Sequence, residues 1–388
     1  MTVIVINAIS IKEGGSLVVL KLLLCAMVEL RPDWEWHIAV NCLAAEALRD
    51  CPVTTCHVFP SSSISGLKVR LWYEIALPRL LKKVRADLLF SQTNYLPARR
   101  LTCPSLLLVQ HAGHFSGRFK AITEAKLGSF VARLSWRLKG LWVKSSVRRA
   151  QAITVQTEAL AKAVAEQTSV PAGRIHVIAH GSGQATLAGR LPSKPVEGQP
   201  VRIGYITKYG VQKNFAVLFN AVAYLKSAGL KPLLVLTLAP ELAENRAVLA
   251  LAEGLGIADC LENHGELAEH ELSHLYGTLH LFVFPSWCES FGFPMLEAMA
   301  HGLPLLIAAT DSNIEISRSA GMIFPSDDAL EIAKLVQRLA SDPGWHQACA
   351  KESMARAQEF TWAKSAVATV SLIENTLASC GNILRQER

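Results

Sequence analysis

The chain has 388 residues, of which 51% are hydrophobic and 18% charged, and its formal net charge at pH 7 is +7. This composition supports a globular protein with a large buried core, and the length indicates two domains. No basic segment precedes the first apolar stretch, and no run of about eighteen uncharged apolar residues occurs, which argues against a secretory signal and a spanning helix. The sequence therefore predicts a cytoplasmic protein. Nine scattered cysteines without a repeated short spacing favour free thiols in a reducing compartment.

Short β-branched runs alternate with longer amphipathic segments along the chain. The runs of the first half are TVIVIN, HIAV, DLLFS, SLLLVQH, AITVQT and IHVIAH, and those of the second half are VRIGYIT, PLLVLTL, LHLFVFPS and LPLLIA. This alternation indicates parallel βαβ units, and a stretch rich in Pro and Gly at residues 189–200 interrupts it. We predict an α/β protein with two doubly wound, Rossmann-like domains, residues 1–190 and 201–360, joined by a linker at residues 191–200. Ligands are expected at the carboxyl ends of the strands, in a central cleft that the domains face.

A glycine pair, Gly14 and Gly15, follows the first predicted strand and opens a helix that begins at about Ser16. Glycines there let the backbone approach a phosphate at a helix N-terminus, where free N–H groups favour anions. A glycine pair is also common in an ordinary turn. The loop alone therefore leaves both interpretations open.

Basic residues concentrate in the first half of the chain. Residues 1–200 carry a net charge of +13 and residues 201–388 carry −6, and no acidic residue occurs from Ala125 to Thr157. In that stretch one helical stripe is apolar and consists of Phe130, Leu134, Leu138 and Leu141. Another stripe is basic and consists of Arg133, Arg137, Lys144 and Arg148. The pattern is consistent with a surface that binds anionic lipid headgroups, or with a solvated helix packed on its own domain. No nucleic-acid-binding module accompanies the charge, so nucleic acid is not an expected partner.

The segment HELSHLYGTLH matches a zinc-protease pattern. His270 and His274 are four residues apart on a predicted helix, with Glu271 as the possible general base and His280 as the third ligand. His280, however, begins a strongly strand-like run, and the apolar residues of the short helix leave His270 and His274 on its outer face. We therefore predict solvated surface histidines, with a zinc hydrolase as the alternative.

The segment FPSWCESFGFPMLEAMAHGLP places a loop between a buried strand and a helix that begins near Pro294. Backbone amides at Phe291, Gly292 and Phe293 would then form an anion site at the helix N-terminus. Glu289 lies just before that site and Glu297 one turn inside the helix, a geometry suited to a sugar diphosphate. Two glutamates seven residues apart are common, so the spacing alone does not assign a function.

The same segment resembles the most diagnostic motif of the retaining GT-B glycosyltransferases of family 4, and the resemblance extends over nearly the whole chain. Gly14 and Gly15 match the family's N-terminal glycine loop, and His111 in LLLVQH matches its histidine at the end of a central strand. Lys208 and Lys213 in YITKYGVQKN match two basic positions of the nucleotide domain. The first of these is normally arginine, and lysine keeps the charge without the bidentate fork.

The resemblance implies an N-terminal domain that binds the acceptor and a C-terminal domain that binds a nucleoside diphosphate sugar. It assigns Gly14, Gly15, Lys208, Lys213, Phe291, Gly292, Phe293 and Glu297 to donor binding, and Glu289, His111 and Lys213 to catalysis. It also implies no metal cofactor, and a C-terminal helix at residues 361–388 that packs back on the N-terminal domain.

The expected reaction is transfer of a hexose from a GDP- or UDP-sugar to a lipid-linked glycan in cell-surface polysaccharide synthesis. The expected location is the cytoplasmic face of the inner membrane, with peripheral contact to its anionic leaflet. A non-catalytic nucleotide- or glycan-binding protein and a sugar epimerase on the same fold are further alternatives. The nucleotide base, the sugar and the acceptor stay open at this point.

Overall fold

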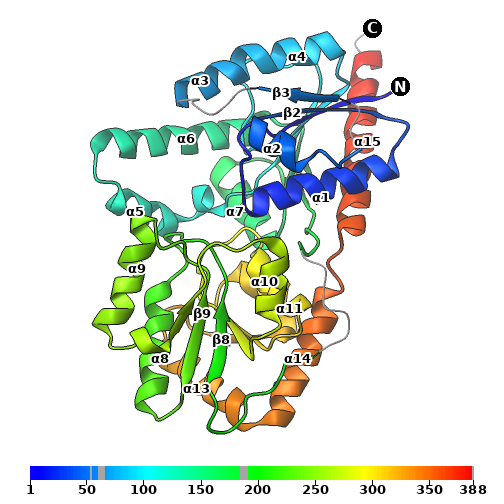
Figure 1. The fold of residues 1–388 in the computed structure, drawn as a ribbon. Coiled ribbons are helices and arrows are strands. Elements are labelled where there is room, and N and C mark those ends of the chain that lie inside the picture. Colours follow the sequence, from blue (N-terminus) through cyan, green and yellow to red (C-terminus); the bar gives the residue numbers. More distant parts are fainter. Residues whose placement is uncertain (53–54, 60–65, 184–190, 387–388) are drawn as a thin grey trace. The chain divides into compact units, whose positions relative to one another are not determined.

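The computed structural model describes the chain except residues 53–54, 60–65, 184–190 and 387–388, and divides it into two compact units (Figure 1). Unit 1 consists of residues 1–183 and 361–388, and unit 2 of residues 184–360. Each unit has its own sheet and its own core. They are described one at a time.

The sheet of unit 1 has seven parallel strands in the order β3-β2-β1-β4-β5-β6-β7. Its strands are β1 (Val3–Asn7), β2 (Glu35–Val40), β3 (Thr55–Val58), β4 (Leu88–Ser91), β5 (Ser105–Leu108), β6 (Ala152–Val155) and β7 (Ile175–Val177). All residues of β4, β5 and β6 are buried, as expected for parallel strands that are covered on both faces. The strand order reverses between β1 and β4, which makes this the topological switch point of a doubly wound sheet.

The helices of unit 1, apart from the C-terminal α15, lie between successive strands in the chain. They are α1 (Gly15–Leu30), α2 (Cys42–Ala47), α3 (Gly66–Leu71), the π-helical η1 (Trp72–Ala76), α4 (Leu77–Val84), the 3₁₀ turn η2 (Ala112–Phe115), α5 (Gly117–Lys126), α6 (Phe130–Arg149), α7 (Glu158–Thr168), η3 (Ala172–Arg174) and the C-terminal α15 (Trp362–Gln386). Side chains from β1, β4, β5 and β6 pack with η1, α4, α6 and α7 in one hydrophobic core. Within the described residues, no helix is both long enough and apolar enough to cross a membrane.

The sheet of unit 2 has six parallel strands in the order β10-β9-β8-β11-β12-β13. They are β8 (Val201–Tyr205), β9 (Pro232–Leu236), β10 (Leu261–Asn263), β11 (Leu281–Phe284), β12 (Leu305–Ala308) and β13 (Gly321–Phe324). The order reverses between β8 and β11, so loops that follow these two strands meet at the switch point of unit 2. The prediction of two doubly wound, Rossmann-like domains is confirmed.

Several helices of unit 2 begin at residues that favour a helix start, namely capping side chains and a first-turn proline. They are α8 (Phe215–Ser227), α9 (Ala243–Gly254), η4 (Ala258–Cys260), α10 (Glu269–Tyr276), α11 (Phe293–Ala300), α12 (Asp311–Ser317), η5 (Arg318–Ala320), α13 (Ala329–Ser341) and α14 (Pro343–Ala357). Thr310 and Asp328 cap α12 and α13 by accepting backbone N–H bonds. Pro294 occupies the first turn of α11, which confirms the helix start predicted near that residue.

The C-terminal helix α15 belongs to unit 1, although it follows unit 2 in the chain. It packs along α1, and Arg31 at the end of α1 pairs with Glu374. At its start, the Trp362 indole donates to the Ser182 carbonyl (2.7 Å), and Ser365 Oγ donates to the Ala179 carbonyl. These contacts fix the start and the middle of α15 to the rest of unit 1.

The units divide after Gly183, whereas the sequence predicted a domain end at residue 190, which lies outside the described residues. The predicted linker at residues 191–200 is part of unit 2. Local packing explains the difference. A Cβ on Gly181 would meet the Trp362 backbone at 2.5 Å, so Gly181 lies against α15, while Pro192 lies against Gly302 of unit 2.

Two cysteines differ from the expectation of free thiols. Cys25 on α1 and Cys51 after α2 form a disulfide, with their Cα atoms 5.6 Å apart. The pairing was missed because 26 residues separate the two cysteines and only the packing of α1 beside α2 brings them together. The other seven cysteines, all within the described residues, are not joined in disulfides: Cys42, Cys56, Cys103, Cys260, Cys288, Cys349 and Cys380.

Candidate functional site

The residues predicted to bind a donor in unit 2 follow the two strands that flank its switch point. Lys208 and Lys213 lie in the loop between β8 and α8, and Glu289 lies in the loop between β11 and α11. Because the strands are parallel neighbours, both loops leave the same edge of the sheet. The fold therefore gathers residues that are about eighty positions apart in the sequence.

Lys213 and Glu289 form an ion pair. Lys213 Nζ donates to Glu289 Oε1 (2.6 Å), and both side chains are mostly buried. The ammonium also lies 5.5 Å from the centre of the Phe284 ring. The loop that carries Lys213 is held by Tyr205, whose hydroxyl donates to the Lys213 carbonyl (2.7 Å). The lysine is thus a fixed positive charge at the sheet edge.

Two residues that sequence reasoning missed complete this cluster. Ser286 Oγ donates to the same Glu289 Oε1 (2.6 Å), and Asn313 on α12 donates to the carbonyls of Ser286 (2.9 Å) and Ala308 (3.1 Å). Ser286 and Asn313 are almost fully buried. Ser286 belongs to the Pro-Ser pair that ends the buried strand, and this pair was the signal in the sequence that could have identified it. Asn313 had no such signal, because its role depends on how α12 packs against the Ser286 loop.

Lys208 is held differently from Lys213. Its Nζ donates to Glu266 Oε1 (2.6 Å) in the loop after β10, and both side chains are more than half exposed. An exposed ion pair of this kind contributes little to stability and is easily exchanged for another partner. Lys208 therefore offers an adjustable charge beside the fixed charge of Lys213.

The predicted anion-binding turn lies at the start of α11. Gly292 is its N-cap with φ 84°, in the left-handed region that favours glycine. A Cβ there would also meet the Phe284 ring at 3.3 Å. Phe291 is buried and packs its ring edge-on against Phe293 and Phe360. Aromatic packing thus holds the turn, and the aligned peptide dipoles of the helix give this end of α11 a partial positive charge.

Glu297 lies in the second turn of α11 and accepts a hydrogen bond from the Tyr276 hydroxyl (3.0 Å) at the end of α10. Burial raises the pKa of Glu297 to about 7, the Tyr276 hydrogen bond lowers it in part, and Glu269 adds to the rise. Burial and the nearby carboxylate raise the pKa of Tyr276 well above its usual range. Glu297 therefore changes charge near neutral pH, unlike an ordinary glutamate.

The remaining predicted residues, Gly14, Gly15 and His111, lie in unit 1. Gly14 is the N-cap of α1 with φ 67°, so this position of the loop favours glycine. His111 follows β5 and caps η2, where its Nδ1 accepts a hydrogen bond from the Gly113 amide (3.1 Å). That bond leaves Nε2 as the nitrogen that carries the proton in the neutral ring.

His111 is supported by a stack of rings that reaches α6. Its ring lies 4.9 Å from His114, which in turn stacks on Trp136 of α6 at 4.8 Å. Burial lowers the pKa of His114 to about 3, with smaller contributions from His111, Lys139 and Lys144, so this ring is neutral. Sequence reasoning missed the contribution of His114 and Trp136 to this site, because twenty-two residues separate them in the chain.

A polar cluster lies at the switch point of unit 1. The Asn7 amide at the end of β1 donates to Ser91 Oγ (3.0 Å) and Thr93 Oγ1 (3.3 Å) after β4. The Tyr73 hydroxyl pairs with the same Thr93. All four residues are buried, so this edge of the sheet, like that of unit 2, carries polar groups where a ligand is expected.

The zinc alternative does not fit the geometry. His270 and His274 are exposed on α10, Glu271 accepts a bond from the Ala268 amide (2.8 Å) as part of the helix start, and His280 Nδ1 accepts from the Arg202 amide (3.0 Å). No group of three or more His, Cys, Asp or Glu side chains in the described parts of the chain is placed to hold a metal ion. The prediction that His270 and His274 face solvent is confirmed.

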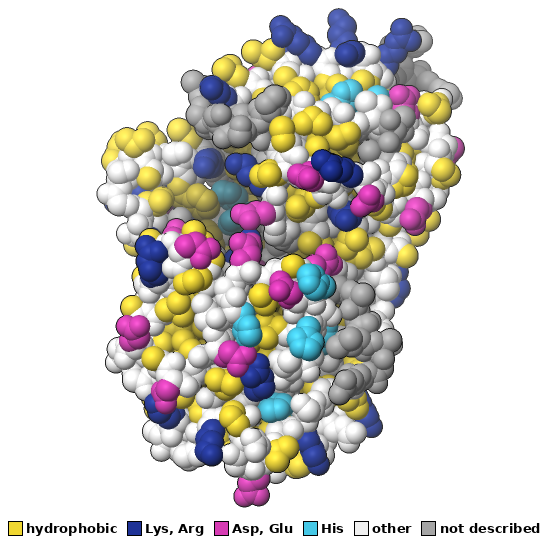
Figure 2. All heavy atoms as spheres, viewed as in Figure 1, with side chains coloured by type: hydrophobic (Ala, Val, Ile, Leu, Met, Phe, Trp, Pro, Cys, Tyr) yellow, Lys and Arg dark blue, Asp and Glu magenta, His cyan; other side chains and the backbone are white. Residues whose placement is uncertain are grey.

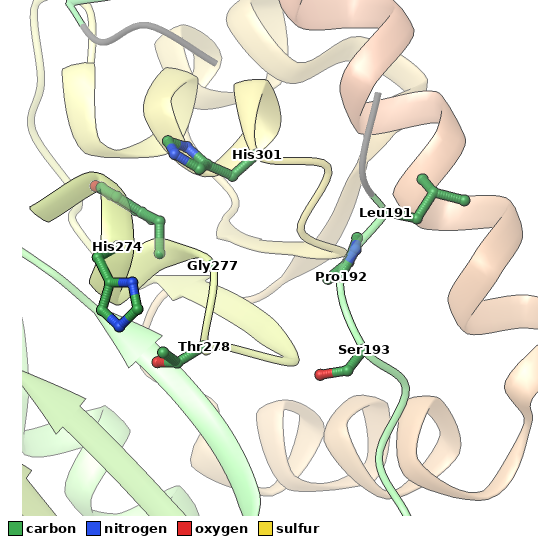
Figure 3. Close-up of a pocket in the computed structure, with 8 residues that line it drawn as sticks. Leu191, Pro192, Ser193, His274, Gly277, Thr278 and His301 are labelled. Atoms are coloured by element: carbon green, nitrogen blue, oxygen red, sulfur yellow. The ribbon is translucent and has the colours of Figure 1, made fainter. Parts of the chain in front are cut away.

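A cavity of about 350 Å³ lies beside α10 in unit 2. Figure 3 shows His274 and Thr278 on one side of it and Leu191, Pro192 and Ser193 on the other. Tyr276 also lines the cavity, but Lys208, Lys213 and Glu289 do not. The charged cluster at the switch point, and not this cavity, therefore has the chemistry of an anion site.

Comparison with known proteins identifies the family of the chain. Two family models match the chain: Glycosyltransferase Family 4 over residues 15–182 and Glycosyl transferases group 1 over residues 192–356. The O-antigen chain mannosyltransferase B of Escherichia coli is 29% identical over 107 residues, which is 28% of this chain and 28% of that protein. The matched stretch thus spans less than a third of that relative.

Solved structures match over almost the full length. Sucrose-phosphate synthase from Thermosynechococcus elongatus has a TM-score of 0.73 at 19% identity, covering 98% of this chain and 100% of that one. Anabaena Alr3699/HepE in complex with UDP-glucose has a TM-score of 0.71 at 15% identity, covering 97% and 100%. These likenesses show the fold. With both halves matched by the two family models, the chain belongs to the group 1, family 4 glycosyltransferases of GT-B fold.

Proposed function

We propose that the protein is a retaining glycosyltransferase that moves a hexose from a nucleoside diphosphate sugar to a lipid-linked glycan. The observation that carries this proposal is the fixed Lys213–Glu289–Ser286 cluster beside the N-terminal turn of α11, with Glu297 one turn further along. One fixed cation, backbone amides and carboxylates at one edge of a sheet form a combination that suits a diphosphate and a sugar.

In the reaction, the bond between the anomeric carbon and the diphosphate oxygen breaks, and its electron pair remains on the diphosphate. Lys213, Lys208 and the amides of Gly292 and Phe293 stabilise that growing negative charge, a preorganised electrostatic role. The acceptor hydroxyl oxygen bonds to the anomeric carbon from the face that the diphosphate leaves, and its proton passes to the departing phosphate or to solvent.

The two glutamates bind the parts of the donor other than the diphosphate, one the sugar and the other the ribose. Glu289 accepts hydrogen bonds from sugar hydroxyls, because Lys213 and Ser286 both donate to its Oε1 and leave its second oxygen for the ligand. Glu297 holds the ribose hydroxyls in its ionised form. In unit 1, the glycine loop and His111, with Nε2 as a donor, contact the sugar or the acceptor near the reacting carbon.

The acceptor is proposed to be a lipid-linked glycan of cell-surface polysaccharide synthesis, handled at the cytoplasmic face of the inner membrane. The E. coli relative named above is an O-antigen chain mannosyltransferase, and the first half of this chain carries the basic charge that suits an anionic membrane. Metal independence is part of the same proposal, since two lysines and backbone amides supply positive charge to the phosphates.

Nucleotide binding in the presence of a chelator tests the proposal. The melting temperature of the protein is measured with UDP, GDP, ADP, CMP and NAD, with EDTA throughout. At a hundredfold excess over its dissociation constant, the correct nucleoside diphosphate adds about 2.7 kcal/mol to the free energy of unfolding. The corresponding sugar nucleotide is then incubated with bacterial lipid-linked glycans. Absence of stabilisation by every nucleotide overturns the proposal.

A further inference from the structure

The N-terminal half of α6 presents an apolar face to solvent. Five large hydrophobic side chains on it are exposed: Phe130 74%, Val131 74%, Leu134 44%, Leu138 56% and Leu141 63%. Figure 2 shows hydrophobic side chains gathered where Figure 1 places the outer end of α6. Exposed apolar residues are common singly, but five on three successive turns of one helix mark an interaction surface.

The opposite face of the same helix is the one that packs on unit 1. An α-helix turns about 100° per residue, which sets Trp136 and Gly140 roughly opposite to Leu134 and Leu138. Trp136 stacks on His114, and Gly140 passes close to the same ring. Further along, Val143 and Val147 are in the hydrophobic core of unit 1. Packing within unit 1 therefore does not account for the outward apolar face.

Positive charge borders this face. Arg133 and Arg137 flank one edge and Lys139 lies near the other, and all three are exposed. Arg137 is paired with Glu124 of α5 (2.9 Å), which removes one net charge. No acidic residue occurs between Ala125 and Thr157, so the border stays positive overall. An apolar stripe with basic margins fits a bilayer interface, with acyl chains at its centre and phosphates at its edges.

We propose that this face of α6, defined by Phe130, Val131, Leu134, Leu138 and Leu141, inserts shallowly into the headgroup region of an anionic membrane. The inference deepens the proposed function, in which the acceptor is lipid-linked, by naming the surface that reaches the lipid. The inward face of α6 supports His111 through Trp136 and His114, so a docked helix holds the His111 loop next to the headgroups. One helix thus carries the membrane contact and supports a candidate reaction histidine.

Vesicle binding by matched variants tests the proposal. Cosedimentation is measured with vesicles of phosphatidylcholine alone and with vesicles that also contain phosphatidylglycerol. The test variant is Leu134→Ser with Leu138→Ser. The control is Leu251→Ser with Leu255→Ser, two leucines with the same spacing at the end of α9 in unit 2, which are also exposed. Both variants remove two exposed leucines, so their effects on folding are comparable.

We expect the wild-type protein to bind the anionic vesicles and not the neutral ones, and to lose affinity at high salt. The α6 variant should bind at least about tenfold more weakly, and the α9 variant should bind like the wild type. Arg133→Glu with Lys139→Glu should also weaken binding to the anionic vesicles. Equal binding of the α6 variant and the wild type, or no binding by either, overturns the proposal.

A second measurement separates this inference from the proposed function. Nucleotide-induced stabilisation and hydrolysis of the sugar nucleotide in solution should be the same in the α6 variant and the wild type, because Lys213 and Glu289 lie in unit 2. If vesicle binding depends on the apolar face of α6 while no nucleotide binds, the membrane proposal is supported and the proposed function fails. If sedimentation shows that the stripe only joins two copies of the protein, and vesicles are not bound, the membrane proposal fails.

Discussion

Lys213 and Glu289 are 76 residues apart in the chain, yet Lys213 Nζ lies 2.6 Å from Glu289 Oε1 in a largely buried pair. The pair exists because β8 and β11 are parallel neighbours whose following loops leave the sheet at the same edge. A buried ion pair is costly when one partner is lost, since the other charge then stays desolvated. The pair therefore couples the folding of the two loops to the charge that a diphosphate would meet.

Replacing this lysine should weaken nucleotide binding. We expect Lys213→Ala to raise the dissociation constant of the nucleoside diphosphate by about tenfold to a hundredfold, because a fixed charge-assisted contact is removed. The variant should also lose about 1–3 kcal/mol of unfolding free energy, because the mostly buried Glu289 carboxylate loses its cation. Calorimetric titration and urea unfolding measure the two effects.

The matched control is Lys226→Ala. Lys226, near the end of α8, forms an ion pair of the same length with Asp259 in unit 2, but that pair is exposed and involves neither loop. Its loss should have little effect on stability, because solvent screens the pair, and should leave nucleotide affinity unchanged. Equal effects of the two substitutions on affinity would contradict the assignment of Lys213 to the donor.

Nucleotide affinity should depend on the ionisation of Glu297. Since burial raises its pKa to about 7, the carboxylate that accepts ribose hydroxyl bonds is a minor species at pH 6 and dominant at pH 8. We expect binding to tighten by about tenfold over this range. Titration calorimetry of Glu297→Gln at the same pH values provides the comparison: its affinity should be weak and nearly independent of pH. A wild-type profile as flat as that of the variant would remove Glu297 from the donor site.

The same residue should make stability fall with rising pH. A glutamate whose folded pKa is about 7 instead of 4.5 binds its proton more tightly in the folded state. The contribution is complete below pH 4.5, is lost progressively up to about pH 7, and amounts to at most about 3 kcal/mol. Urea unfolding of the wild type and Glu297→Gln across this window should give curves whose difference changes in that direction. A constant difference would show that the carboxyl titrates normally.

Glycine at position 113 should be required for the placement of His111. A Cβ there would lie 2.6 Å from His111 Cε1 and 2.7 Å from the Phe119 ring, so one of the rings must move. We expect Gly113→Ala to cost about 1–3 kcal/mol and to lower kcat while leaving the KM for the donor almost unchanged. Gly173→Ala in unit 1, where a Cβ meets no heavy atom within 4 Å, is the control. An unchanged kcat in Gly113→Ala would separate His111 from the reaction.

The start of α15 should anchor the helix to unit 1. Trp362 stacks on His180 with ring centres 5.5 Å apart, and its indole donates to the Ser182 carbonyl. Trp362→Ala should cost about 2–4 kcal/mol, whereas Val367→Ala, at a position that is 52% exposed on the same helix, should cost less than about 1 kcal/mol. Hydrogen exchange of the α15 amides should increase in the first variant only. Unchanged exchange would mean that the packing on α1 and the Ser365 hydrogen bond hold the helix without Trp362.

The sequence predicted the elements well where periodicity and helix-start signals agree. The fully apolar strands, the start of α11 at Pro294 and the exposure of His270 all follow from local patterns. Local patterns also predicted the apolar stripe from Phe130 to Leu141. They could not decide whether that stripe faces the core, because periodicity tells which residues share a face and not what covers it.

The parts of the site that the sequence missed depend on contacts between distant segments. Asn313 joins the Ser286 loop only because α12 follows the neighbouring strand β12. Trp136 reaches His114 only because α6 packs against the η2 turn that follows β5. The Cys25–Cys51 pairing has the same origin in the packing of α1 beside α2. The family resemblance supplied the roles of Glu289 and Lys213, while their hydrogen bond required the fold.

The contact between Gly181 and Trp362 also defines how the gene could be rearranged. The chain leaves unit 1 and re-enters it at two neighbouring points, so unit 2 is topologically an insertion in unit 1. A few residues could bridge Gly181 to Trp362 directly, giving a unit 1 with continuous connectivity and without unit 2. Conversely, removing residues from the C-terminus truncates unit 1 and not the domain that precedes them in the sequence.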